Sequence, residues 1–259
     1  GQHPVETQLN GQALLNFSSN DYLGLASHPE LVAALKRAAD SDGVGSGASA
    51  LVTGFREEHH LLEQELAAFL QREKVLLCSS GYLANLAMVT SLTGRGDVII
   101  QDKLCHASLI DAARLSEARL LRYAHADMAA LQRQLAMKSD GNKLVISDGI
   151  FSMDGDTAPL VGMVEACRQH SAWLAIDDAH GVGVCGPGGR GSVAAAVAAA
   201  AGSGGSSLTA AQRLRQRGGS TGEAAAWRWR RQPAVTVVAV WRRWPAAAAA
   251  AQAEARRRQ

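Results

Sequence analysis

Five short apolar runs alternate with amphipathic segments along the middle of the chain, and this alternation limits the folds that it can adopt. The runs lie at 75–78, 97–100, 119–123, 143–147 and 173–176, and helices are expected near 82–92, 106–116, 127–137 and 160–170. Strands that alternate with helices form parallel sheets that helices cover on both faces. We therefore predict an α/β fold with a mainly parallel sheet.

The segment before this alternation gives a sparser pattern. A short strand is predicted at 13–17, followed by an irregular turn rich in Ser, Asn and Asp. A helix is predicted after Pro29, and Glu57 to Leu70 has the apolar spacing of a second amphipathic helix. Gly43, Gly45 and Gly47 predict a loop between these helices.

The composition changes after Ser192. The remaining residues are rich in Ala, Gly, Arg and Trp, lack Lys and Asp, and contain one strand-like run at 235–240. This tail is either a basic arm for nucleic acid or an acidic partner, or an out-of-frame translation. The second interpretation is favoured, because a selected basic arm would include Lys, so no nucleic acid is expected as a partner. The predicted regions are thus an amino-terminal segment (1–42), a large domain (43–192) and a low-complexity tail (193–259) that is disordered or out of frame.

The chemistry of the remaining residues excludes several protein classes. The four Cys are scattered without a CxxC pair, so neither a metal site nor a disulfide framework is predicted. No run of about 18 apolar residues predicts a membrane span. We expect a cytoplasmic protein, and because the first residue is Gly, we expect its native amino terminus to be lacking.

The apolar run at 173–176 is followed by Asp177-Asp178-Ala179-His180. Ligands of open α/β sheets bind beyond the carboxyl ends of the strands, so Asp177 and His180 are candidate site residues. The alternative is an ordinary turn with a surface histidine. The next residues, 181–186, match G-x-G-x-x-G, but Pro187 and further glycines follow where a dinucleotide site needs a helix.

Two further candidates stand at the start of predicted helices. Ser80-Gly81-Tyr82 lies between an apolar run and a helix, where free backbone N–H groups favour a phosphate. His106 stands at the start of the next helix. Either feature alone is more often a helix cap or a structural histidine.

Six segments, in this order, resemble motifs of the α-oxoamine synthases. They are the stretch 16–25 (NFSSNDYLGL), 45–47 (GSG), 80–85 (SGYLAN), 106–109 (HASL), 149–156 (GIFSMDGD) and 177–181 (DDAHG). The family consists of pyridoxal-phosphate enzymes with the aspartate-aminotransferase fold, so the resemblance implies an incomplete large domain of that fold. The first and last motifs look most like the branch that uses L-alanine and a pimeloyl thioester.

The resemblance implies catalytic roles for His106, Asp177 and His180, and pyridoxal 5'-phosphate as the cofactor. Asp177 would pair with the pyridine nitrogen of the cofactor. His180 would form a hydrogen bond with its phenolic oxygen, and His106 would stack on its ring. The backbone of Gly81 and Tyr82 would meet the phosphate, and Ser152 would bond beside the cofactor. The implied partners are L-alanine, pimeloyl-CoA or a pimeloyl-carrier protein, and a second copy in a homodimer.

Two expected residues are missing. Family members carry the cofactor-binding lysine roughly fifty to sixty residues after the Asp-Ala-His motif, whereas all five lysines here precede Asp177. A substrate arginine expected upstream of the first motif is absent as well. We expect a chain without turnover. The alternatives are a glycine C-acetyltransferase or 5-aminolevulinate synthase, and a non-catalytic protein that keeps the cofactor pocket.

Overall fold

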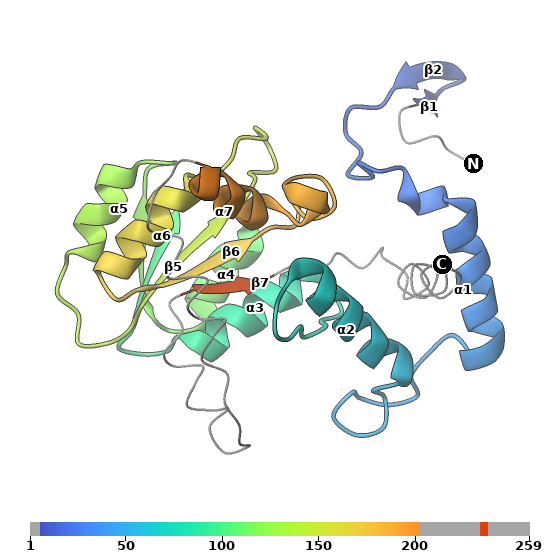
Figure 1. Cartoon of the computed structure of the whole chain (residues 1–259), viewed down its shortest axis with the longest axis horizontal. Coiled ribbons are helices and arrows are strands. Elements are labelled where there is room, and N and C mark those ends of the chain that lie inside the picture. The colour runs from blue at the N-terminus through green and yellow to red at the C-terminus, as the bar shows by residue number, and fades with distance from the viewer. Residues whose placement is uncertain (1–5, 203–233, 238–259) are drawn as a thin grey trace. The chain divides into compact units, whose positions relative to one another are not determined.

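The computed structural model describes residues 6–202 and 234–237, which fall into two compact units (Figure 1). Of the described residues, the first unit holds 6–77 and the second holds 78–202 and 234–237. The division expected at 42/43 and 192/193 stays a prediction for the intact protein.

The first unit opens with an antiparallel hairpin of β1 (Glu6–Leu9) and β2 (Gln12–Leu15). Asn10 and Gly11 connect the strands with φ values of 52° and 81°. A two-residue turn with positive φ at both positions matches the right-handed twist of a hairpin, and Asn-Gly is its preferred sequence. The strand predicted at 13–17 thus ends at Leu15, two residues earlier than expected. Strand β1 was not predicted, although the Asn10-Gly11 turn sequence indicates a hairpin.

Two predicted helices follow in the first unit. A 3-10 turn, η1 (Leu25–Ser27), precedes α1 (Pro29–Asp42), and Pro29 occupies the first helical turn, where its missing N–H costs no hydrogen bond. Helix α2 (Glu57–Leu70) starts at a reciprocal cap in which the Arg56 N–H donates to Nδ1 of His59 at 3.1 Å. Both helix predictions are confirmed, and the glycine loop between them has neither helix nor strand.

The strand predicted at 75–78 does not form. Residues 75–78 have no regular secondary structure and pair with no strand of the described chain. A strand needs the backbone groups of a neighbour to satisfy its own N–H and C=O groups. The apolar run is present in the sequence, but the partner that would turn it into a strand is not among the described residues.

The second unit contains a five-stranded, all-parallel sheet in the order β4-β3-β5-β6-β7, which confirms the predicted architecture. Its strands are β3 (Val98–Asp102), β4 (Arg119–Tyr123), β5 (Lys143–Asp148), β6 (Trp173–Asp177) and β7 (Ala234–Val237). Its main helices are α3 (Gly81–Leu92), α4 (Ala107–Leu115), α5 (Met128–Leu135), α6 (Leu160–Gln169) and α7 (Ser192–Gly202).

Helices cover both faces of this sheet (Figure 1). Successive strand residues point to opposite faces, so Ile100 packs with α5 and α6 while Ile99 packs with α3 and α4. Both isoleucines are fully buried. The two cores hold the strands in one layer, and the carboxyl ends of β3, β5 and β6 therefore meet at one edge.

The segment predicted as a low-complexity tail begins with helix α7, which covers residues 193–202 of it. Val193 and Ala196 pack against the core on the α5 and α6 face, and this contact gives the Ala-rich segment an apolar surface to fold on. The strand-like run at 235–240 contributes β7, which pairs with β6 from Leu174 to Asp177. The rest of the predicted tail lies outside the described residues. None of the described helices has the length and hydropathy to cross a membrane.

Candidate functional site

Four buried aspartates gather at the carboxyl edge of the sheet. Asp102, Asp148 and Asp177 end β3, β5 and β6, and Asp178 follows directly; each is at most 7% exposed. Burying a carboxylate is costly unless hydrogen bonds or charges compensate it. The partners of these groups therefore define what the edge can do.

Asp177 accepts two hydrogen bonds that fix its carboxylate. Its Oδ2 accepts from Nδ2 of Asn85 at 2.6 Å, and its Oδ1 accepts from the Ala179 N–H at 3.0 Å. Asn85 comes from α3, on the face of the sheet that α3 and α4 cover, and is 1% exposed. The carboxylate is thus held by a neighbouring helix and by its own turn.

The same amide joins Asp177 to His106. Nδ2 of Asn85 also donates to Oγ of Ser108 at 2.8 Å, and that hydroxyl lies 2.7 Å from Nδ1 of His106. His106 caps α4 by accepting from the Ser108 N–H at 3.2 Å. Two residues predicted from separate motifs are therefore connected by one hydrogen-bonded series, Asp177–Asn85–Ser108–His106.

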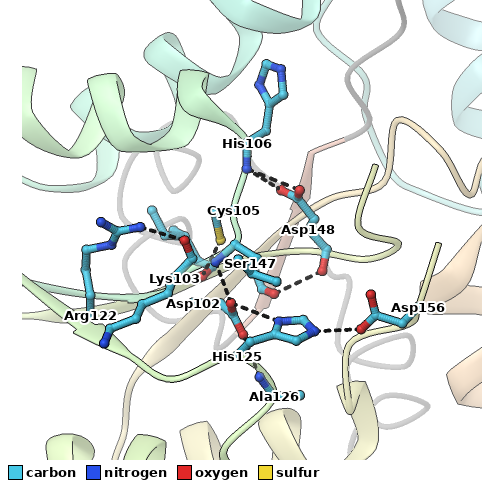
Figure 2. Close-up of polar contacts among 12 residues, drawn as sticks. Asp102, Lys103, Cys105, His106, Arg122, His125, Ala126, Ser147, Asp148 and Asp156 are labelled. Atoms are coloured by element: carbon cyan, nitrogen blue, oxygen red, sulfur yellow. Dashed lines mark hydrogen bonds and ion pairs between the residues drawn. The ribbon is translucent and has the colours of Figure 1, made fainter. Parts of the chain in front are cut away.

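Asp148 holds the backbone of His106. Its two carboxylate oxygens lie 3.3 and 3.2 Å from the His106 N–H (Figure 2). Burial raises the pKa of Asp148 to about 7, and the nearby Asp177 and Asp102 carboxylates add to the rise, while the His106 N–H opposes it. The end of β5, beside Asp177 on β6, thus carries a carboxyl group with a pKa near neutrality.

The predicted phosphate seat lies at the start of α3. Ser80 caps this helix, and its Oγ accepts from the Leu83 N–H at 3.2 Å while its carbonyl accepts from the Ala84 N–H. The amides of Gly81 and Tyr82 belong to the first turn, where a helix offers no internal acceptor. The Tyr82 hydroxyl donates to Asp111 at 3.0 Å, and this bond raises the pKa of Tyr82.

His180 and Ser152 stand on separate segments of the same edge. His180 lies three residues after Asp177, in a turn that the Gly181 and Val182 N–H groups close onto the Asp178 carbonyl. Ser152 is exposed, on the loop between β5 and α6. The series that joins Asp177 to His106 does not extend to Ser152.

Asp178 explains the glycines that follow it. Its Oδ2 accepts from the Ser192 N–H at 2.9 Å, and a Cβ atom at Gly181 or Gly191 would collide with its carboxylate. Only a short 3-10 turn, η2 (Pro187–Gly189), follows the G-x-G-x-x-G match. Gly181 in that match thus allows the chain to fold closely around a buried aspartate, and the helix that a dinucleotide site needs is not there.

Three members of the site were not identified from the sequence, namely Asn85, Ser108 and Asp148. Asn85 and Ser108 lie within quoted motifs, and Asn85 falls one helical turn after Gly81, a spacing that could have indicated a shared face. Asp148 ends an apolar run, as Asp177 does. Among the described residues, no cluster of His, Cys, Asp and Glu side chains has the arrangement of a metal site.

Curated proteins with similar sequences share one enzyme name. The chain is 58% identical over 186 residues to an 8-amino-7-oxononanoate synthase of Nitrosospira multiformis, covering 72% of this chain and 47% of the relative. It is 55% identical over 192 residues to the Marinobacter nauticus enzyme of the same name, covering 74% and 48%. The chain thus spans about half the length of the curated relatives that it matches.

The fold of the chain is also similar to that of solved enzyme structures. A serine palmitoyltransferase of Sphingomonas wittichii is similar with a TM-score of 0.72 and 36% identity, covering 75% of this chain and 49% of that one. An 8-amino-7-oxononanoate synthase of Francisella tularensis is similar with a TM-score of 0.59 and 33% identity, covering 69% and 49%. The sequence profile of aminotransferase class I and II matches residues 12–214. Because that match covers most of the chain, the protein belongs to the aminotransferase class I and II family.

Proposed function

We propose that this chain is the cofactor-binding part of a pyridoxal-phosphate-dependent C-acyltransferase that makes 8-amino-7-oxononanoate. The reaction joins L-alanine to a pimeloyl thioester, releases the thiol carrier and loses carbon dioxide. The proposal is supported by the six ordered motifs and by relatives of that name at 55–58% identity. The single observation that carries it is the buried Asp177 carboxylate, held by Asn85 in a series that leads to His106.

The residues present fit pyridoxal phosphate. Oδ1 of Asn85 is buried without a partner among the described residues, so a polar group of the site remains to be satisfied beside Asp177. A carboxylate that accepts two hydrogen bonds is suited to hold a protonated pyridine nitrogen. When bound, the cofactor supplies an electron sink for a substrate carbanion.

The protein's own groups would orient this cofactor. Asp177 would hold the ring nitrogen, His106 would cover one ring face, and His180 would donate to the phenolic oxygen. The Gly81 and Tyr82 amides would bind the phosphate at the positive end of α3. Ser152 would bond at the edge of the ring from the β5–α6 loop.

The lysines limit what the chain can do alone. All five precede Asp177, and Lys143 is bonded through Nζ to the carbonyls of Leu135 and Met137 at 2.6 Å. An amine is needed to bind the cofactor covalently and to move the α-proton. We expect no measurable turnover and no specific cofactor–lysine adduct after borohydride reduction. Peptide mapping by mass spectrometry checks this, and one stoichiometric adduct together with activity would contradict it.

The activity itself is tested in a restored protein. Residues 1–192 are joined to the carboxyl-terminal half of the Nitrosospira multiformis relative, and thiol release from pimeloyl-CoA is measured with alanine, glycine or serine. We expect a clear preference for alanine. The Asp177→Asn variant should be slower by several orders of magnitude, because removal of an essential catalytic group commonly has an effect of that size. Asp140→Asn, at an exposed residue outside the six motifs, is the matched control and should keep the rate.

Other outcomes would select other functions. Preference for glycine would indicate a glycine C-acetyltransferase or a 5-aminolevulinate synthase, and preference for serine would follow the structural likeness to serine palmitoyltransferase. Cofactor binding without turnover in the restored protein would favour a non-catalytic binding protein. The absence of a lysine after Asp177 is the observation that favours this last candidate.

A further inference from the structure

His125 lies between two carboxylates at the carboxyl edge of the sheet, outside the series that holds Asp177. Its Nδ1 is 3.1 Å from Oδ1 of Asp102, and its Nε2 is 2.7 Å from Oδ2 of Asp156 (Figure 2). His125 belongs to the turn between β4 and α5, and the carboxylates belong to β3 and to the β5–α6 loop. One ring therefore connects three segments that are distant in sequence.

On one side, Asp102 ties the histidine to the turn that ends at His106. The Asp102 carboxylate is buried and accepts from the Leu104 N–H and the Ala126 N–H, each at 2.8 Å. Leu104 stands two residues before His106, and Ala126 follows His125. Asp102 thus fixes the His106 turn and the His125 turn against each other.

On the other side, Asp156 ties the histidine to the loop that carries Ser152. Backbone bonds close this loop at its base, from the Phe151 N–H to Asp156 at 3.0 Å and from the Ala158 N–H to Gly149 at 3.0 Å. The Phe151 ring is buried and meets the His125 ring edge-on, with centroids 4.4 Å apart. The loop is therefore anchored to His125 by one ion pair and one aromatic contact.

This arrangement depends on the charge of the ring. A neutral imidazole has one N–H donor and one acceptor, whereas the protonated ring donates from both nitrogens. Asp102 and Asp156 are the acidic groups that face it. Burial lowers the pKa of His125, but the hydrogen bonds and charges of Asp102 and Asp156 outweigh burial, so the pKa is raised overall.

We propose that His125 is a positioning residue that holds the Ser152 loop in a fixed place relative to the His106 turn. The assignment of Ser152 and His106 to the cofactor rests on the proposed function, whereas the mechanical link between their segments does not. The link gives two residues from different elements a common frame. A site that must grip a flat ring from its face and its edge needs such a frame, because errors in position are costly.

The first test uses the chain without cofactor. Asp156→Asn removes the charge at the Nε2 end, and Asp154→Asn makes the same change two residues earlier in the same loop. We expect Asp156→Asn to lower the proton affinity of His125 about tenfold, the low end of the effect of a neighbouring opposite charge, because Asp156 is partly exposed. We also expect amide exchange in residues 150–157 to become about tenfold faster, by the loss of about 1.4 kcal/mol of local stability. NMR titration of the histidine ring protons and hydrogen exchange of the loop measure both.

The control decides the outcome. Asp154→Asn should leave the His125 titration and the loop exchange as in the unchanged protein. His125→Gln, which keeps one side-chain donor, should give loop exchange between those of the unchanged protein and His125→Ala. Equal effects of Asp156→Asn and Asp154→Asn, or a loop that exchanges no faster in His125→Ala, would overturn the positioning role.

A second measurement separates this inference from the proposed function. Pyridoxal phosphate is titrated into the chain and followed by its absorption spectrum. If the unchanged protein binds it and Asp156→Asn binds it severalfold more weakly, both proposals are supported. If the unchanged protein does not bind it, the claim that this part of the enzyme binds the cofactor by itself fails, while the loop and titration data still decide the role of His125. Equal binding by both proteins with a loosened loop would overturn the functional part of the inference.

Discussion

The two units of the chain bury their apolar side chains to very different extents. In the first unit, Ala34, Leu66 and Leu70 are the buried apolar residues among those described, whereas Phe17, Val44 and Leu51 are 92–98% exposed. The second unit encloses two continuous cores on the faces of its sheet. It also buries four aspartates, an asparagine and a glutamine.

The difference shows where the fold is self-sufficient. A parallel sheet with helices on both faces completes its own core. The apolar side chains of β3 to β6 are therefore covered by those of α3 to α6. Helices α1 and α2 have apolar faces but few apolar neighbours in the described chain. The chain spans about half the length of its curated relatives. We expect these exposed apolar side chains to be covered in a protein restored to the relatives' full length.

The largest effect should come from a cavity in the second unit. Leu144 in β5 is fully buried beside Ile99, in the core on the α3 and α4 face, so Leu144→Ala should destabilise the unit by about 2–5 kcal/mol. Leu115→Ala, at a residue 63% exposed in α4, should change stability by less than about 0.5 kcal/mol. Urea unfolding followed by hydrogen exchange of the β3 and β5 peptides measures both. Similar losses in the two variants would mean that the sheet is not the stable part of the chain.

A smaller effect is expected from the polar interior of the second unit. Asn85→Ala removes the donor that serves Asp177 and Ser108 and leaves both groups buried, which should cost about 1–3 kcal/mol. Asn142→Ala, at an exposed position before β5, is the control and should be neutral. The same urea titration reports the result. A neutral Asn85→Ala would show that the buried amide is dispensable for stability.

Asp148 should make the stability of the second unit depend on pH. Its pKa in the folded chain is about 7 against an ordinary value of 3.8, so the folded state binds the proton more tightly than the unfolded state. This stabilising contribution is complete below about pH 4 and is lost as the pH rises through 7, with a slope of at most about 1.4 kcal/mol per pH unit. His125 acts in the same direction, because its pKa is raised above the usual value of 6.5.

The measurement is the free energy of unfolding between pH 4 and 8. Asp148→Asn should flatten this profile and lose little of the His106 contact, because the amide oxygen can still accept from the His106 N–H. The exposed Asp140→Asn should leave the profile unchanged. A profile as steep in Asp148→Asn as in the unchanged protein would assign the pH dependence to another group.

The smallest effect on the chain alone is expected in the first unit. Leu51→Ser changes a side chain that is 98% exposed, so the stability of the chain should move by less than about 0.5 kcal/mol. In the protein restored with a carboxyl-terminal half, the same change should cost more, because the residue would then be covered. Thermal unfolding of both proteins with and without the substitution tests this, and equal small effects would break the interpretation of an uncovered surface.

Local patterns in the sequence predicted most of the elements. The alternation of apolar runs and amphipathic segments predicted β3 to β6 and α3 to α6, because the repeat of side-chain directions is set within each element. The position of Asp177 after an apolar run predicted a site at a strand end. The six motifs predicted an α-oxoamine synthase with the aspartate-aminotransferase fold, and the match to aminotransferase class I and II over 12–214 confirms the broader family.

Contacts between distant residues were decided by the tertiary structure alone. Asn85 and Asp177 are 92 residues apart, and His125 and Asp156 are 31 apart, so no local pattern indicates that they meet. Two segments show that a local pattern alone does not decide whether an element forms: the apolar run at 75–78 and the Ala-rich segment after Ser192. The first lacks a strand partner and stays irregular, and the second finds a core face and becomes α7. A sequence specifies the tendency of each segment, but the pairing that realises the tendency depends on which other segments the fold brings beside it.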